Sequence, residues 1–589
     1  MLKNKWVNAS IWILIASIII LSPIILNKTA IMGVDSYFHY NRIYESAMQL
    51  RHWNFSFLNL YSFQHAGRVV DQVYSPLVTY FFGAILLVVH NWMRFQIISI
   101  MLVCYVAGIS MYAAAQKLKL THHLSVTLSL IYLSSFSIYS FIFGTNWRAL
   151  SMAIVPLLMG SIVTLYHGDW SSKYMLHLGI VVALLAQIQL LTTLLVLPIL
   201  LPFFIRGLRH AQHKLVQLGK LLISILTALI LSLNVILPYL ELVQGNTILP
   251  PSKLVLTQGV TNLIVPSDKL TQSLSIAILC LVFYLGLGGL IYFWKQTSTF
   301  VRLLLITASV YIILGTSLTP WMAIEKSWPV LANFLQLPRR FTIIGIPLLL
   351  LGVGQLYNNL SVKKAENHQQ LLSYIGTILA AASVLSLALA VTKPVSAYNN
   401  PTVKLAKGLQ TSKNHAIGHH FQGKKVKRII DIQPAFHTRN LSTLIQIVDR
   451  TTPDYVPVDK VNDMISYYVL YDQQIINKQY NYNYQVKPAG VLQLNWHSKQ
   501  AKTLQVPVVA YHRTTVTLNG QTLKHSQIKQ TNLGAVIVKA QAGKNTLQLS
   551  YRPKLSTRMG IWLAMFGWFL IPIIWCYQKL TTQRSARKH

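Results

Sequence analysis

The chain has 589 residues, of which 53% are hydrophobic and only 11% are charged. Soluble globular proteins carry roughly 25% charged residues, so this composition excludes a soluble multidomain enzyme, a disordered chain and a coiled coil. The charge is one-sided, with 51 Lys and Arg against 14 Asp and Glu. Because the apolar content indicates a membrane protein, we assign the basic excess to membrane topology and predict no nucleic-acid partner.

Apolar runs recur along most of the chain. A transmembrane helix needs about 20 predominantly apolar residues. The first run follows two lysines and lacks a small-residue cleavage site, so it predicts a retained anchor and not a cleaved signal peptide. The runs lie near residues 6–26, 95–115, 124–143, 149–166, 174–205, 218–238, 270–293, 300–316, 341–357, 371–391 and 559–577.

The basic clusters between these runs set the topology, because cytoplasmic loops carry the excess of Lys and Arg. If all the clusters are cytoplasmic, run 174–205 crosses twice, with an outer turn at 187–193. The shorter run 76–90 then does not cross and lies in the outer interface. This predicts a polytopic α-helical protein of the cell membrane with about 12 transmembrane helices and with both termini in the cytoplasm.

The composition changes after Lys393, where long apolar runs stop. Alternating residues 514–518 run into Asn519-Gly520, a strong hairpin signal, and residues 535–538 and 545–551 read as further strands. We therefore expect a jelly-roll-like β-sandwich. The predicted domains are a transmembrane domain (1–392) with a long first outer loop (27–94), an extracytoplasmic β domain (393–556), and a last transmembrane helix with a basic cytoplasmic tail (557–589).

The predicted β domain is strongly basic, with 22 Lys and Arg against 6 Asp between residues 393 and 554. Such a charge suits an anionic envelope polymer or anionic lipid headgroups. The alternative is a solvated surface that is kept soluble by its charge.

Asp35 follows the first apolar run by a few residues. If the chain continues there as a helix, Asp35, His39 and Arg42 recur at i, i+4 and i+7 on one face. A carboxylate beside an imidazole and a guanidinium predicts a general base that is held ionised by its neighbours. The alternative is a helix N-cap with Arg42 as a simple ion-pair partner.

Further charged residues lie near the predicted outer face. Arg68 and Asp71 stand at i, i+3, either as a surface ion pair or as part of the same cleft. Arg148, Arg339 and Arg340 begin predicted spans at a side where arginine is disfavoured, which predicts phosphate binding by at least one of them. The alternative for Arg148 is contact with lipid phosphates.

Four short motifs occur in the order found in a family of bacterial membrane proteins. The chain resembles the YfhO and pyruvoyl-tetrahydropterin-synthase-related family, whose second name implies no pterin chemistry. The resemblance is carried by residues 33–43, by Tyr74-Ser75-Pro76-Leu77, by Trp147-Arg148-Ala149-Leu150 and by Leu337-Pro338-Arg339-Arg340-Phe341.

That family resembles the GT-C glycosyltransferases, polytopic enzymes with a catalytic carboxylate near the end of the first span. The resemblance implies that Asp35 is the catalytic base. It implies a donor-phosphate site at the arginines Arg148, Arg339 and Arg340. The expected supporting residues are His39, Arg42, Arg68, Asp71 and Tyr74.

The predicted function is transfer of a sugar from a polyprenyl-phosphate donor to an acceptor outside the cell, either a teichoic-acid-like wall polymer or a lipid. A donor-synthesising glycosyltransferase is a further expected partner. The loop has no Asp-x-Asp pair, which favours a metal-independent enzyme and leaves a divalent cation open. The alternatives are a polysaccharide or lipid transporter or flippase, and a non-catalytic membrane-anchored cell-envelope binding protein.

Overall fold

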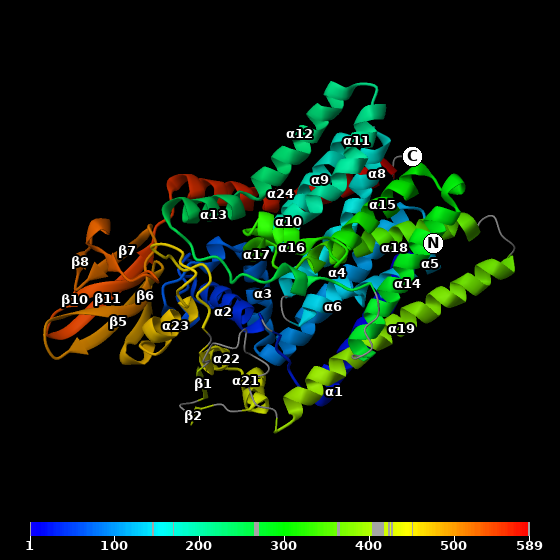
Figure 1. Cartoon of the computed structure of the whole chain (residues 1–589). Coiled ribbons are helices and arrows are strands. Elements are labelled where there is room, and N and C mark those ends of the chain that lie inside the picture. The colour runs from blue at the N-terminus through cyan, green and yellow to red at the C-terminus, as the bar shows by residue number, and fades with distance from the viewer. Residues whose placement is uncertain are drawn as a thin grey trace.

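The computed structural model describes residues 2–33, 35–143, 146–168, 170–263, 270–361, 366–402, 418–421, 424–425, 428–449 and 451–586. Val34 of the first resemblance motif, and the tail from residue 587, lie outside these residues. A bundle of helices makes up most of the molecule, and a β-sandwich lies at one end of it (Figure 1). The start of α1 and the end of α24 lie at the opposite end of the bundle.

The first half of the chain is helical. Its helices are α1 (Leu2–Asn27), α2 (Ser36–His52), α3 (Pro76–Val89), α4 (Trp92–Lys117), α5 (His122–Leu133), α6 (Phe136–Ile142), α7 (Asn146–Ile154), α8 (Met159–His167), α9 (Ser172–Ile188), α10 (Leu190–Val196), α11 (Leu200–His210), α12 (Lys214–Leu231) and α13 (Leu233–Gly245).

The second half holds the remaining helices. They are α14 (Leu270–Tyr292), α15 (Thr299–Leu314), α16 (Trp321–Ser327), α17 (Leu331–Phe334), α18 (Arg339–Ser361), α19 (Glu366–Asn399), α21 (Gln433–His437), α22 (Ser442–Gln446), α23 (Tyr467–Tyr471) and α24 (Leu555–Ala586).

Eight helices within the described residues are long and apolar enough to cross a membrane. Four shorter apolar helices accompany them: α3, α9, α15 and residues 276–292 of α14. The protein is therefore a multi-pass membrane protein. The predicted total of 12 crossings and the sidedness of the termini remain predictions.

Two features of the predicted topology can be seen in where helices end and how long they are. Run 174–205 is interrupted at Gln189, whose extended backbone (φ −159°) separates α9 from α10 inside the predicted outer turn. Run 76–90 forms α3, which has only 14 residues and is too short to span a bilayer. α3 packs closely on α2 at Gly83. A Cβ added to Gly83 would lie only 2.8 Å from the Ala47 backbone nitrogen.

Two antiparallel sheets form the β-sandwich. One sheet has the order β4-β5-β11-β7-β8, and the other has the order β6-β10-β9. Buried residues from both, such as Leu494 of β5 and Val536 of β10, belong to one core, as the alternation of side chains predicts. The strands are β4 (Asn483–Lys487), β5 (Val491–Ser498), β6 (Lys502–Val509), β7 (Thr514–Leu518), β8 (Gln521–Thr522), β9 (Lys529–Gln530), β10 (Ala535–Ala540) and β11 (Gly543–Tyr551).

The predicted hairpin is confirmed. Asn519 and Gly520 have φ values of 49° and 87° and connect β7 to β8, as a tight turn with two left-handed residues requires. The strands of the sandwich all lie within 483–551, a smaller region than the predicted 393–556. Three short strands, β1 (Gly418–Phe421), β2 (Lys424–Lys425) and β3 (Val448–Asp449), form a separate small sheet.

The first loop and the sandwich share a hydrophobic core. Leu58, Leu60, Ala66 and Val69 are fully or almost fully buried in the same cluster as the strand residues. The Ala66 carbonyl also accepts a hydrogen bond from the Val509 backbone nitrogen (2.8 Å). The sandwich is therefore fixed to the loop that follows Asp35.

Candidate functional site

A short strap between α1 and α2 positions Asp35. Two buried glutamines fix its backbone: Gln433 Oε1 accepts a hydrogen bond from the Ala30 nitrogen (3.0 Å), and Gln96 Oε1 accepts one from the Ile31 nitrogen (3.0 Å). The Gly33 nitrogen donates to the Phe143 carbonyl (2.8 Å). Because these partners come from three distant parts of the chain, the position of Asp35 depends on the assembled fold.

The Asp35 side chain does not act as a helix cap. Asp35 directly precedes α2, but no capping hydrogen bond from its carboxylate is found in the described structure. The side chain is half-buried. Its charge lies close enough to Arg148, Arg340, Tyr74 and Tyr455 for Coulomb interaction with each of them. The carboxylate therefore lies in a cluster of charged and phenolic side chains, which we call the recess.

Arg148 begins α-helical span 148–167 and lies in this recess. It is half-buried, and its Nε lies 3.4 Å from the side-chain oxygen of Gln189. The extended residue that interrupts run 174–205 thus contacts a predicted phosphate-binding arginine. Arg148 contacts the Gln189 side chain and interacts with the charge of Asp35. The alternative, contact with lipid phosphates, therefore does not by itself account for the position of Arg148.

Arg340 is the more buried member of the predicted arginine pair. Only 5% of it is exposed, and its terminal nitrogens donate to the Phe334 carbonyl (3.0 Å) and to Gln336 Oε1 (3.2 Å). Its Nε has no hydrogen-bond partner among the described residues, and neither does the buried Nε of Arg339. The charge of Arg339 reaches Arg148, so all three predicted arginines converge on one region.

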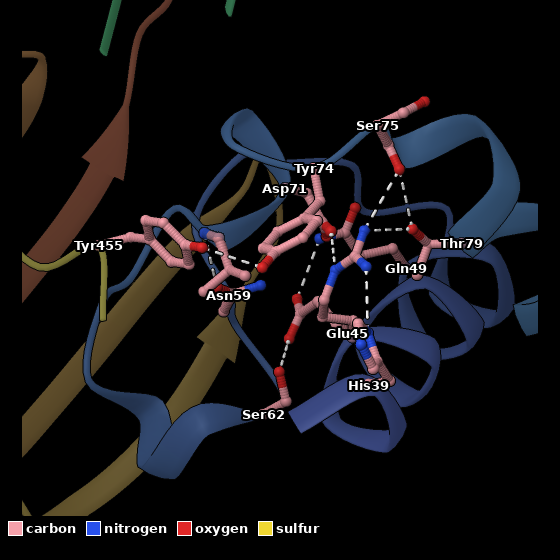
Figure 2. Close-up of polar contacts among 12 residues, drawn as sticks. His39, Glu45, Gln49, Asn59, Ser62, Asp71, Tyr74, Ser75, Thr79 and Tyr455 are labelled. Carbon is pink, nitrogen blue, oxygen red and sulfur yellow. Dashed lines mark hydrogen bonds and ion pairs between the residues drawn. The ribbon is translucent and has the colours of Figure 1, made fainter. Parts of the chain in front are cut away.

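Tyr74 and Tyr455 complete the recess. Their hydroxyl oxygens lie 3.0 Å apart (Figure 2). Burial raises the pKa of each phenol above its ordinary value, so both remain protonated at neutral pH. Since only one hydroxyl hydrogen is used between them, the other can be donated to a ligand.

The sequence analysis missed Tyr455. It lies in an irregular segment, and its backbone adopts a left-handed conformation (φ 67°) that is unfavourable for a tyrosine. The Tyr455 nitrogen donates to the Leu249 carbonyl (2.9 Å), and its carbonyl accepts a hydrogen bond from the Tyr511 hydroxyl (3.0 Å). The only local signal is the pair of prolines that flanks this segment, Pro453 and Pro457.

Arg42 forms an ion pair with Asp71, and the expected cluster of Asp35, His39 and Arg42 on one helix face stays a prediction. Arg42 is fully buried, and its Nε lies 3.0 Å from Asp71 Oδ1. It also contacts Thr79 Oγ1 (3.0 Å) and His39 Nδ1 (3.4 Å) and stacks under the Tyr74 ring at 4.5 Å. Arg42, held by Asp71 and His39, therefore positions the Tyr74 ring.

One of the two alternatives for Arg68 and Asp71, a surface ion pair, is wrong, because both side chains are buried and Asp71 pairs with Arg42. Arg68 is fully buried and donates to the Thr452 and Asp454 carbonyls and to Thr452 Oγ1 (3.0 Å). The residues that it binds directly precede Tyr455. Arg68 therefore positions the second tyrosine, much as Arg42 positions the first.

No group of three or more His, Cys, Asp or Glu side chains that could hold a metal ion occurs in the part of the chain that the structure describes. What the recess offers is one carboxylate as a proton acceptor, guanidinium groups for an anion and phenol hydroxyls as donors. This combination suits chemistry in which a hydroxyl loses a proton while negative charge develops on a phosphate.

No family model and no curated protein matches the chain. Among solved structures, the chain is similar to the arabinofuranosyltransferase AftD from Mycobacteria, with 13% sequence identity and a TM-score of 0.45. The match covers 67% of this chain and 27% of that chain. The chain thus spans about a quarter of the length of that protein, and the likeness is too low to support an inference about activity.

Proposed function

We propose that this protein is a membrane glycosyltransferase of the GT-C type that transfers a sugar from a polyprenyl-phosphate donor to an acceptor hydroxyl outside the cell. The observation that carries the proposal is the convergence of Asp35 with Arg148 and Arg340 in one recess. The recess lies at the β-sandwich end of a bundle of apolar helices, and we expect the lipid-linked donor to bind there.

In this proposal the guanidiniums hold the donor phosphate. Arginine presents several N–H groups in a planar fork that matches phosphate oxygens. Buried polar groups almost always have a partner, so the unsatisfied Nε atoms of Arg339 and Arg340 are expected to gain one when an anion is bound. Fixed cations then stabilise the charge that develops on the leaving phosphate.

Asp35 is the proposed base. Its carboxylate removes the proton of the acceptor hydroxyl while the hydroxyl oxygen attacks the anomeric carbon. The bond between the anomeric carbon and the phosphate oxygen breaks, and the electron pair leaves with polyprenyl phosphate. Single displacement inverts the anomeric configuration. The free hydroxyl hydrogen of the tyrosine pair is available for a sugar or phosphate oxygen.

The proposal is tested by replacing Asp35 with Asn in the full chain. Membranes containing the variant are incubated with radiolabelled polyprenyl-phosphate sugars, and transfer to polymer and lipid is measured. Asp472→Asn is the matched control, because Asp472 lies near the β-sandwich and away from the recess. Loss of transfer in Asp35→Asn alone supports the proposal. Equal transfer by wild type and Asp35→Asn removes Asp35 from the mechanism.

A further inference from the structure

A groove of about 940 Å³ lies where the helical bundle meets the β-sandwich. It is lined by residues 249–253, by Asn333 of α17, by residues of the segment 454–468 and by Asn532, which lies between β9 and β10. α17 belongs to the bundle and α23 to the segment that leads into the sandwich (Figure 1). The groove is therefore built by four parts of the chain and is large enough for an extended ligand.

The walls of the groove are fixed by hydrogen bonds. Asn333 Nδ2 donates to the Pro251 carbonyl (2.9 Å), and the Leu249 nitrogen donates to the Val456 carbonyl (3.0 Å). An ion pair of 2.6 Å between Lys253 and Asp463 joins the two sides. These contacts hold the groove in shape without a ligand.

The charge of the groove differs from that of the rest of the protein. Three of the 14 acidic residues of the chain, Asp454, Asp459 and Asp463, line it, against two lysines, Lys253 and Lys460. The whole chain has a net charge of +37. Since the groove has one more carboxylate than cations, it does not favour a polyanion such as a phosphate-rich polymer.

The polar lining suits hydroxyl groups. Carboxylates accept hydrogen bonds from hydroxyls, and amides such as that of Asn462 both accept hydrogen bonds from hydroxyls and donate to them. Tyr467 and Tyr468 supply flat apolar faces with a polar tip. The Tyr468 hydroxyl lies 2.9 Å from Ser252 Oγ, which ties this ring to the opposite wall. Polar groups that alternate with aromatic rings favour a polyhydroxylated ligand over an apolar one.

One wall of the groove adjoins the candidate site along the chain. Asp454 lines it, and the next residue, Tyr455, contacts Tyr74 in the recess that holds Asp35. A ligand that lies in the groove would therefore end near the proposed base. We propose that this groove binds the acceptor and that the bound part of the acceptor is a neutral saccharide. This inference rests on the proposed function and names its acceptor class.

The test measures binding separately from transfer. The full chain carrying Asp35→Asn is purified in detergent, and calorimetry measures its binding of maltohexaose, cellohexaose, the N-acetylglucosamine hexamer and polyglycerol phosphate. The groove variants are Tyr468→Ala and Asp459→Asn, and Tyr468→Phe retains the ring. Tyr480→Ala changes an exposed tyrosine outside the groove and is the matched control.

We expect at least one neutral hexasaccharide to bind. Tyr468→Ala and Asp459→Asn should weaken its Kd about tenfold, the effect of one lost contact of about 1.4 kcal/mol. The Kd of Tyr468→Phe and of Tyr480→Ala should stay within about twofold of that of the parent protein. All variants should have the melting temperature of the parent. The inference is overturned if no neutral hexamer binds, if the groove variants bind normally, or if polyglycerol phosphate binds there instead. If membranes with the wild-type chain transfer no sugar from a polyprenyl-phosphate donor, the proposed function fails, whatever the groove binds.

Discussion

The Tyr74 hydroxyl lies 3.0 Å from the Tyr455 hydroxyl, although 381 residues separate them in the chain. Each tyrosine depends on a buried arginine: Arg42 lies under the Tyr74 ring, and Arg68 binds the backbone just before Tyr455. The contact therefore joins the first loop to the segment that leads into the β-sandwich, beside Asp35.

Tyr455→Phe tests whether this pair contributes to transfer. The variant keeps the ring and removes the hydroxyl, so Tyr74 loses its partner and the recess loses one donor. We expect transfer to fall about tenfold to one-hundredfold, as for a lost hydrogen bond to a charged group of about 1.5–3 kcal/mol. Transfer assays in membranes measure this effect, with Tyr480→Phe as the control. A normal rate in Tyr455→Phe would restrict the pair to a structural role.

Arg340→Lys tests the proposed phosphate contact. Lysine keeps the positive charge but loses the fork that donates to Phe334, to Gln336 and, in the proposal, to the donor. We expect the KM for the polyprenyl-phosphate donor to rise about tenfold, the equivalent of about 1.4 kcal/mol. Arg94→Lys is the control, because Arg94 is an exposed arginine in the first turn of α4. An unchanged KM would contradict the assignment of Arg340.

Several parts of this structure could be predicted from the sequence. The hairpin at Asn519-Gly520, the interruption near Gln189 and the short helix α3 follow from local signals, namely left-handed turn residues, basic flanks and run length. These signals lie within a few residues of the feature that they predict. The roles of Asp35 as base and of Arg148, Arg339 and Arg340 as a donor-phosphate site stay predictions.

Other parts could not be predicted, because they depend on packing between distant segments. Arg42 was expected on the same helix face as Asp35, and the fold of the first loop brings Asp71 to 3.0 Å from it. A surface ion pair with Asp71 was one alternative for Arg68, yet the β-sandwich covers the first loop and buries Arg68. Tyr455 lies in an irregular segment with no periodicity, so no local pattern assigns it to the site.

The Arg42–Asp71 pair should be important for stability. Asp71→Asn leaves a buried guanidinium without its counter-charge, so we expect a loss of about 3–5 kcal/mol in the free energy of unfolding. The double variant Arg42→Met, Asp71→Leu removes both charges and should recover part of that loss. Thermal unfolding in detergent compares the three proteins. If the single and double variants are equally destabilised, charge burial is not the cause.

The Gln96 side chain should control the position of Asp35. Gln96→Leu has a similar size but leaves the Ile31 nitrogen without its acceptor, at a cost of about 1–3 kcal/mol. Because the strap then loses one of its fixed points, we expect transfer to fall more than the amount of folded protein does. Gln116→Leu, on the same helix α4 and away from the strap, is the control. Equal transfer per folded molecule in both variants would mean that the strap does not need this contact.

Glu45 should give the protein a pH-dependent stability. This carboxylate is fully buried and accepts hydrogen bonds from the Leu60 and Tyr61 nitrogens, from the Ser62 hydroxyl and from Gln49 (Figure 2). Burial nevertheless raises its pKa from 4.5 to about 7. A raised pKa in the folded state means that the folded protein binds the proton more tightly than the unfolded chain does.

The contribution of Glu45 to stability is therefore fully present below pH 4.5 and is lost as the pH rises through about 7. Its total size is about 3 kcal/mol, from the linkage between pKa and folding. Glu45→Gln does not titrate, and its amide nitrogen cannot accept the bonds that one carboxylate oxygen accepts. We expect a lower melting temperature at every pH and a weaker dependence on pH between 4.5 and 7 than in the wild type. If the melting temperatures of the two proteins change equally with pH across this range, Glu45 stays ionised in the folded state. The four hydrogen bonds that it accepts then outweigh the effect of burial on its pKa.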